Sequence, residues 1–179
     1  MLEGRRVRLE PLEERHHDEL FAISRDPRIW ALQRVRGDES MERFDEWYAS
    51  IHMGFAHYFE GRLVGHTSYG NDRPHDRAVE VGNTWLVPDV WSSGANAEAK
   101  YLLLKHAFED EGYLRVSFKT ESTNERSRAA LAALPAEFEG IHRKDMLVRG
   151  GERRDSAWYA VTIETWPETR LRLEAKLAG

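Results

Sequence analysis

Apolar positions in the first half of the chain change from strand-like to helix-like spacing. Residues 7–9 alternate with charged neighbours and predict a strand that ends at Pro11. Residues 13–24 and 41–52 carry apolar side chains at three- and four-residue intervals, which predicts two helices. Asp26-Pro27 is expected to stop the first helix. Two further strand-like runs flank Glu60-Gly61 and predict a hairpin, namely residues 55–59 and 63–69.

The second half repeats the alternation of strands and helices. Strand-like runs occupy residues 79–87, 114–119, 137–148 and 156–164. Helical spacing occupies residues 96–111, 124–134 and 166–178. No repeat, low-complexity segment or linker interrupts this order. We therefore expect one α+β domain over residues 1–179, with a mixed central sheet of about seven strands flanked by about four helices.

The composition and charge of the chain exclude several classes of protein function. A chain of 179 residues with 41% hydrophobic and 32% charged residues is ordinary for a globular protein with a proper core. No membrane span or signal-peptide pattern is visible, so a cytoplasmic location is expected. A net charge of −5 argues against nucleic-acid binding. The absence of cysteine removes thiolate catalysis, and the eight histidines show no metal-ligand spacing, so no metal is expected.

The most informative stretch is residues 80–100, where an apolar strand leads through a small, polar turn into a helix. The small residues of this turn would let an anion approach the backbone N–H groups, and the following helix dipole favours negative charge. Asn96 is predicted as the helix N-cap, with Glu98 in the first turn. The turn comprises Trp91, Ser92, Ser93, Gly94, Ala95 and Asn96.

The spacing of residues in this turn distinguishes between the known types of phosphate-binding loop. The nucleotide-triphosphate motif GxxxxGK[ST] and the dinucleotide motif GxGxxG are both missing. The remaining pattern, W-x-x-G-x-N after a strand, resembles the pyrophosphate loop of the GNAT superfamily of N-acetyltransferases, in the variant of its RimJ/RimL-like branch. Residues 2–20, 96–109, 116–131, 137–144 and 153–167 resemble further segments of that branch in the same order. Without this resemblance, an ordinary strand-to-helix turn would explain the loop.

The resemblance implies acetyl-CoA as cosubstrate. Its pantetheine amides would pair with the strand before the loop, and its pyrophosphate would bind the N–H groups of residues 91–96. The strand positions concerned are Trp85, Leu86 and Val87. A cradle made of backbone alone would need no Lys or Arg inside the loop.

Two residues begin the next predicted helix as N-x-x-S. Local chemistry favours Asn124 as an N-cap and Ser127 as a first-turn residue. The resemblance instead implies that Asn124 reaches the pantetheine and that the Ser127 hydroxyl can bond the thioester sulfur. Ser127 would then stabilise the leaving thiolate or relay a proton.

The general base has two candidates. Glu80 lies on the strand that leads into the loop, and simple alternation puts Glu80, Gly82 and Thr84 on one face. The alternative for Glu80 is an ordinary pairing with an Arg at the sheet edge. Asp145 is the rival by resemblance, although Met146 occupies the aligned position. Pro135 replaces the usual glycine after the helix, and because proline resists positive φ we expect the helix to end differently there.

The acceptor is expected to be a primary amine, either a protein N-terminus or a small molecule. Most aromatic residues of the first two helices should pack in the core, but Trp30 is a candidate to line the acceptor cleft. Membrane partners are not expected, and a homodimer is compatible with the sequence. The predicted activity is acetyl-CoA-dependent N-acetyl transfer by direct attack on the thioester. The alternative is a catalytically idle coenzyme A binding or scaffold module of the same fold.

Overall fold

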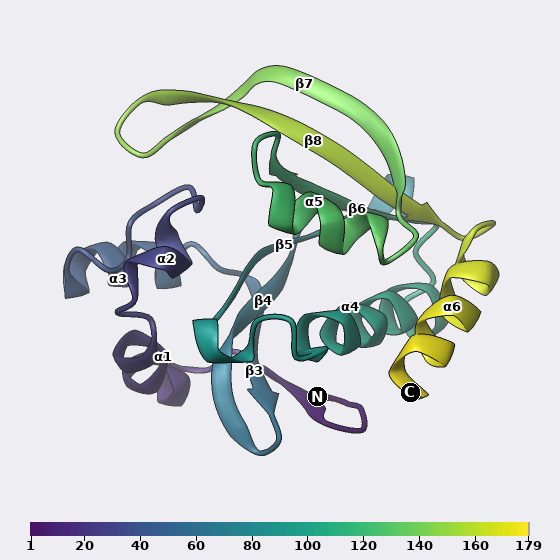
Figure 1. Ribbon diagram of the computed structural model, residues 1–179, viewed down its shortest axis with the longest axis horizontal. Coiled ribbons are helices and arrows are strands. Elements are labelled where there is room, and N and C mark those ends of the chain that lie inside the picture. The colour runs from purple at the N-terminus through teal and green to yellow at the C-terminus, as the bar shows by residue number, and fades with distance from the viewer. Residues whose placement is uncertain (179) are drawn as a thin grey trace.

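The computed structural model describes residues 1–178, which form one mixed eight-stranded sheet (Figure 1). The strand order is β1-β2-β3-β4-β5-β6-β8-β7, and β5 with β6 is its parallel pair. The strands are β1 (Leu2–Glu3), β2 (Val7–Pro11), β3 (Met53–Phe59), β4 (Arg62–Arg73), β5 (Ala78–Leu86), β6 (Arg115–Glu121), β7 (Glu137–Val148) and β8 (Glu152–Thr162). The expected α+β class is confirmed, with eight strands where about seven were expected.

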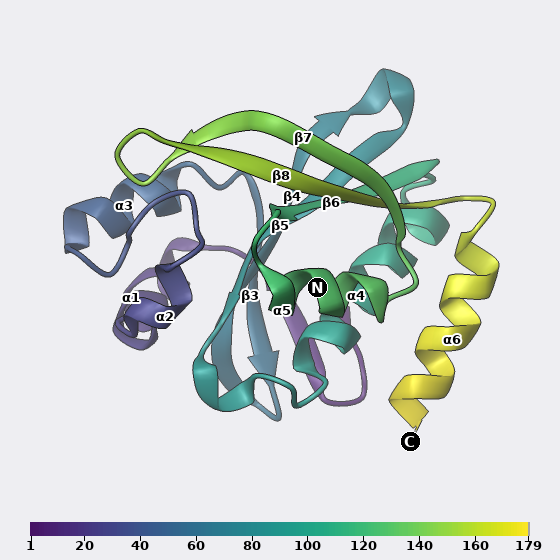
Figure 2. The same ribbon diagram turned by 45° about the horizontal axis from the view of Figure 1, so that its top comes forward.

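Helices cover both faces of this sheet. Figure 2 shows α1, α2 and α3 on one side and α4, α5 and α6 on the other. The α-helices are α1 (His17–Ile23), α2 (Pro27–Trp30), α3 (Met41–Ala49), α4 (Ala95–Lys105), α5 (Glu125–Ala132) and α6 (Trp166–Ala178). Short 3-10 turns occupy Glu14–His16, Pro74–Asp76 and Pro88–Val90, and α4 continues as a π-helical turn over His106–Asp110. In the described part of the chain, no helix has the length and apolar character that a membrane crossing requires.

The extra helix α2 begins at the residues expected to be only a stop. Asp26 is its N-cap and accepts a hydrogen bond from the Arg28 amide at 2.9 Å, while Pro27 occupies the first turn. Proline suits that position because its missing N–H has no helical partner there. The dipeptide expected to stop the first helix therefore starts α2, whereas α1 already ends at Ile23 with Ser24 as its C-cap.

The predicted hairpin is confirmed in β3 and β4. Phe59 pairs with Arg62 across a two-residue turn in which Glu60 and Gly61 have φ of 49° and 80°. Two consecutive positive φ values match the turn that suits the twist of paired strands.

β5 and β6 diverge at the middle of the sheet. Their parallel pairing runs from Ala78↔Arg115 to Val81↔Phe118 and then ends, although both strands continue. On its other side, β5 contains an irregularity opposite β4, where Asn83 adopts φ of 48°. Because the two strands separate, the backbone N–H and C=O groups at the end of β5 have no neighbouring strand on the β6 side.

This irregularity corrects the expected alternation. Beyond Asn83 the side chains of β5 exchange faces of the sheet. Trp85 therefore packs against Trp30 and Trp47 beneath the α1–α3 layer. Thr84 turns to the opposite face, where its hydroxyl lies 2.8 Å from that of Thr67. A bulge adds one residue to a strand and exchanges the faces of everything after it.

The start of α4 also differs from expectation. Gly94, not Asn96, is the N-cap, with φ of 93°, and Asn96 lies inside the first turn. Glu98 is only 6% exposed, and its Oε1 accepts hydrogen bonds from the amides of Arg6 and Val7 at 3.0 and 3.4 Å. This carboxylate therefore fixes the start of β2, which is next to the edge strand β1, to α4.

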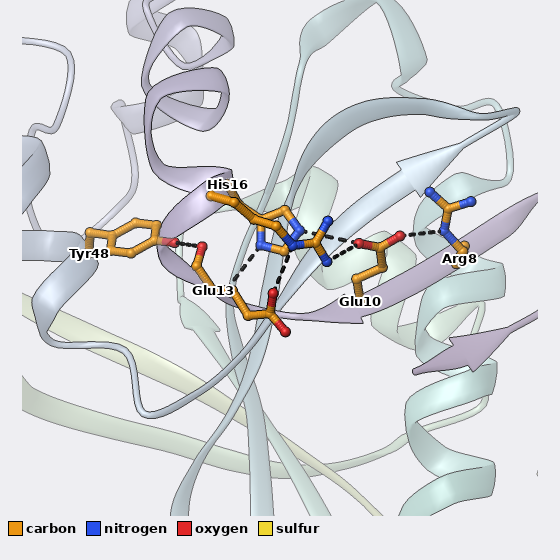
Figure 3. A network of polar contacts seen from close by, with 6 residues as sticks. Arg8, Glu10, Glu13, His16 and Tyr48 are labelled. Carbon is orange, nitrogen blue, oxygen red and sulfur yellow. Dashed lines mark hydrogen bonds and ion pairs between the residues drawn. The ribbon is translucent and has the colours of Figure 1, made fainter.

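A polar network joins the end of β2 to α1 and α3 (Figure 3). Glu10 contacts Arg8 at 2.9 Å and the buried His16 at 3.3 Å. The Tyr48 hydroxyl donates to the Glu13 carbonyl at 2.7 Å. The network fixes the α1–α3 layer to the end of β2.

The end of α5 contradicts the expected effect of proline. Pro135 has φ of 28°, in the region that favours glycine, and the Ala136 amide bonds to the Leu131 carbonyl at 3.3 Å. The chain thus turns as it would with a glycine, and the proline ring is strained because it prefers φ near −65°.

Candidate functional site

A cavity of about 860 Å³ lies where β5 and β6 diverge. Its walls come from both strands, the loop before α4, the start of α5 and the segment after α2. The sequence-predicted residues that line it are Glu80, Trp85, Leu86, Trp91, Ser92, Gly94, Asn96, Asn124 and Ser127. The predicted residues outside its lining are Trp30, Val87, Ser93, Ala95 and Asp145.

The loop at 91–96 offers part of the expected backbone cradle. Ser92 and Gly94 have positive φ values of 64° and 93°, which turn successive amides toward a common side. Within residues 1–178, the amides of Gly94, Asn96 and Ala97 meet no acceptor. Unpaired N–H groups at a helix start form a ready anion site.

Three other amides of the loop already donate hydrogen bonds within the protein. The amides of Trp91 and Ser93 donate to the carbonyls of Pro88 and Val90 at 3.1 and 3.2 Å. The Ala95 amide donates to the Ser93 hydroxyl at 3.3 Å. These bonds shape the loop, and within residues 1–178 they leave the amide of Ser92 and those of its second half free to bind an anion.

A lysine missed in the sequence lies beside the loop. Lys100 is one helical turn after Asn96, lines the cavity, and donates from Nζ to the Asn96 Oδ1 at 2.9 Å. Burial lowers the pKa of Lys100 to about 8. Spacing of four residues along a helix was the available signal, because it places both side chains on one face.

Trp91 fixes the loop to the end of β5. Its Nε1 donates to the Leu86 carbonyl at 2.9 Å, and the Arg126 guanidinium lies 3.6 Å from its ring centroid. Arg126 comes from α5, so this contact joins the two walls of the cavity at their ends. Arg28 of α2 lies 5.8 Å from the same ring.

Asn124 and Ser127 adopt the arrangement that local chemistry favours. The Asn124 Oδ1 accepts a hydrogen bond from the Ser127 amide at 3.0 Å, which makes Asn124 the N-cap of α5. Both residues also line the cavity. Within the described residues the Ser127 hydroxyl has no hydrogen-bond partner, so it is available to a bound molecule.

Glu80 lines the cavity from β5 and is 9% exposed. Burial raises the pKa of Glu80 even though the Lys119 ammonium, 3.6 Å away, opposes that rise. A carboxylate held in this way binds a proton more readily than an exposed one. The alternative pairing expected for Glu80 involved an Arg, whereas the structure pairs it with a Lys.

Asp145 lies in the irregular part of β7, and its carboxylate is 3.9 Å from the His142 imidazole. Met146, the aligned position, lines the cavity instead. The structure thus brings Glu80 and Ser127 to one cavity and leaves Asp145 outside its lining.

Trp30 is not exposed, contrary to the expectation for an acceptor-lining residue. Its side chain is 0% exposed, and its Nε1 donates to the Ser24 carbonyl at 2.7 Å. The ring packs edge-to-face on Trp47 and Phe44, so it belongs to the core beneath α3. Its neighbours Arg28, Ile29 and Ala31 line the cavity.

The β7–β8 hairpin contributes Met146 and Arg154 to the lining of the cavity and arches toward α2 and α3 (Figure 1). At its turn, Arg149 donates to the carbonyls of Gln33 and Arg34 and pairs with Glu121 at 3.0 Å. Gln33 in turn donates to the Thr84 carbonyl of β5 at 3.1 Å. No local sequence pattern relates these distant segments, so this contact could not be predicted from the sequence.

Comparison with known proteins identifies the architecture. The family model described as the acetyltransferase (GNAT) domain matches residues 6–136. A T. thermophilus protein, provisionally assigned as an acetyltransferase, is 37% identical, with 98% of this chain and 96% of that chain covered and a TM-score of 0.89. A GCN5-related N-acetyltransferase from Brucella melitensis is 29% identical over 97% of this chain and 83% of that one, with a TM-score of 0.89.

RimJ of Mycobacterium smegmatis, solved in complex with CoA-disulfide, is 21% identical and shares the fold. Its TM-score is 0.78, over 95% of this chain and 88% of that chain. A search of curated sequences finds no match.

Proposed function

Because the chain belongs to the GNAT family of acetyltransferases, we propose that it transfers an acetyl group from acetyl-CoA to a primary amine by direct attack on the thioester. The observation that carries this proposal is the cavity between the diverging ends of β5 and β6. It joins unpaired loop amides, a free hydroxyl and a buried carboxylate in one space.

The second half of the loop would hold the pyrophosphate. The amides of Gly94, Asn96 and Ala97 are unpaired, and the α4 dipole adds positive potential. The unpaired edge of β5 around Trp85 and Leu86 would bind the pantetheine amides. Asn124 would contact the same arm while it caps α5.

Acetyl transfer forms a C–N bond and breaks a C–S bond, so the amine must lose a proton and the sulfur must gain one. Glu80 would accept the proton of the amine, directly or through water. Ser127 would donate a hydrogen bond to the leaving sulfur, and solvent would supply the proton. Asp145 is the rival for the role of base, although it is outside the cavity lining.

The test of this function is thiol release from acetyl-CoA in the presence of primary amines and N-terminal peptides. Amine-dependent release supports the transferase. Coenzyme A binding without release from any amine in the panel would support the idle module instead.

Ser127→Ala should lower kcat by about 10- to 1000-fold, because a donor to developing negative charge is lost. The KM for acetyl-CoA should change little. The N-cap of α5 remains, because the hydrogen bond to the Asn124 side chain comes from the backbone amide of residue 127 and not from the serine hydroxyl. Ser122→Ala is a matched control, because Ser122 precedes α5 and is outside the cavity lining. A wild-type kcat for Ser127→Ala, where chemistry limits the rate, would contradict the assigned role.

A further inference from the structure

The cavity carries positive charge in an acidic protein. Its lining holds seven basic residues and a single carboxylate, Glu80, although the chain has a net charge of −5. The basic residues are Arg28, Arg34, Lys100, Lys119, Arg126, Arg154 and Lys176. Phosphates bound at the loop would account for the cations near Trp91 and Asn96. They do not account for those on the opposite face of the sheet.

A second group of cationic side chains lies beside Glu80, because side chains alternate between the two faces along β6 and β8. Glu80 pairs with Ser117 on β6, and Lys119, two residues further on, faces the same side. Lys119 pairs with Trp158 on β8, and its ammonium lies 4.9 Å from that ring. Arg154 is on the same face of β8, four residues earlier.

Arg154 is buried without a partner. It is 9% exposed and lines the cavity, and its Nε has no hydrogen-bond partner. Within residues 1–178, no ion pair or hydrogen bond reaches its side chain. Leaving a buried charged donor unpaired is costly, so such a group is expected to have a ligand.

The nearby carboxylates have other partners. Glu121 is held by Arg149 at 3.0 and 3.1 Å, and Glu80 by Lys119 at 3.6 Å. Asp145 lies 3.9 Å from His142. The charges of these three carboxylates act on Arg154 without pairing with it.

We propose that the acceptor is a small amine that also bears a carboxylate, and that Arg154 together with Lys119 binds this carboxylate while the amino group faces Glu80. This proposal rests on the acetyltransferase function given above and names its substrate class. An acceptor with only an ammonium group would be repelled by this wall. A carboxylate on the same molecule balances the charge, and the cations also favour the neutral amine that attacks.

The test compares amines that differ only in the carboxylate. Glycine, β-alanine and γ-aminobutyrate are each paired with their amides, and binding to the coenzyme A-loaded protein is measured by calorimetry alongside acetylation by mass spectrometry. We expect the carboxylate member of at least one pair to bind about 10- to 100-fold more tightly, as for a charge-assisted bond. Arg154→Met should remove this preference, and Arg154→Lys should retain part of it.

Arg153→Met is the matched control, because Arg153 is the adjacent arginine and is exposed. It should keep the wild-type preference. Equal binding of both members in every pair, no binding of any, or an undiminished preference in Arg154→Met would overturn the inference. If the carboxylates bind through Arg154 but are not acetylated, the carboxylate-binding site stands, and the proposed transferase function fails together with the role of these amines as acceptors. Tight binding of an N-terminal peptide amide with no carboxylate preference would favour a protein acceptor and overturn the inference.

Discussion

Glu80→Gln is expected to lower the plateau of kcat/KM by about 100-fold or more, which is within the range for loss of a positioned general base. The glutamine keeps the size of the side chain but cannot accept the proton of the amine. Because burial raises the pKa of Glu80, the wild-type profile should show an acidic limb above the ordinary range of a glutamate. Activity should rise with pH through that limb, since the base works only when ionised. Steady-state rates across pH measure both effects.

Asp145→Asn is the control for this prediction. Asp145 is outside the cavity lining, so its variant should retain most of the plateau. Thermal shifts with coenzyme A should be unchanged in both variants. Plateaus that match the wild type in both would refute the carboxylate base. The enzyme would then select the neutral fraction of its amine, and the apparent pKa would follow the basicity of the substrate.

The protein should lose several kcal/mol of stability as pH falls from about 6.5 to about 5. His57 and His66 are both 0% exposed, and burial lowers their pKa values to about 3 and about 4. The ordinary histidine pKa is about 6.5, so between these values the unfolded chain binds more protons than the folded one. Their contribution is therefore complete above pH of about 6.5 and is lost as pH falls toward the folded values. Each histidine contributes a slope of up to about 1.4 kcal/mol per pH unit.

Urea unfolding at intervals between about pH 7 and pH 5 measures this slope. His57→Gln and His66→Gln should each reduce it, whatever their stability at neutral pH. His75→Gln is the matched control, because His75 is exposed and should not alter the slope. A stability that is constant over this interval, or an equal slope in all three variants, would contradict the account.

The sequence predicted those parts of the fold that local chemistry decides. The hairpin at Glu60-Gly61 followed from turn chemistry, and the last helix was predicted with its observed bounds, 166–178. The loop at 91–96 was located because small residues between a strand and a helix are a local feature. Asn124 as an N-cap was likewise local, since the cap and its amide are three residues apart.

The differences arise where distant segments decide the outcome. The reversal of faces after Asn83 depends on pairing between β4 and β5, which a single strand pattern does not contain. Trp30 is buried because α3 packs over it, so its position after Asp26-Pro27 did not indicate its exposure. Glu98 bonds to β2 across more than ninety residues of chain, where local reasoning saw only a favourable helix dipole.

The basic lining of the cavity was also missed, because its residues are dispersed in the sequence. Lys119, Arg126 and Arg154 come from β6, α5 and β8, and no window of the chain contains two of them at a suggestive spacing. An overall negative charge concealed this local excess of cations. Only the folded sheet brings them to one cavity.

Binding of coenzyme A at the loop before α4 is tested most directly by melting temperature. The shift that coenzyme A causes is measured in the wild type, Gly94→Glu and Gly94→Ala. A ligand at about 100 times its dissociation constant adds about 2.7 kcal/mol to the folded state, and ATP or NAD should do much less. Gly94 has φ of 93°, so both substitutions strain the loop, but only the glutamate adds a negative charge to the anion site. We expect a large shift in the wild type, a reduced one in Gly94→Ala and none in Gly94→Glu. A full wild-type shift in Gly94→Glu would contradict this expectation.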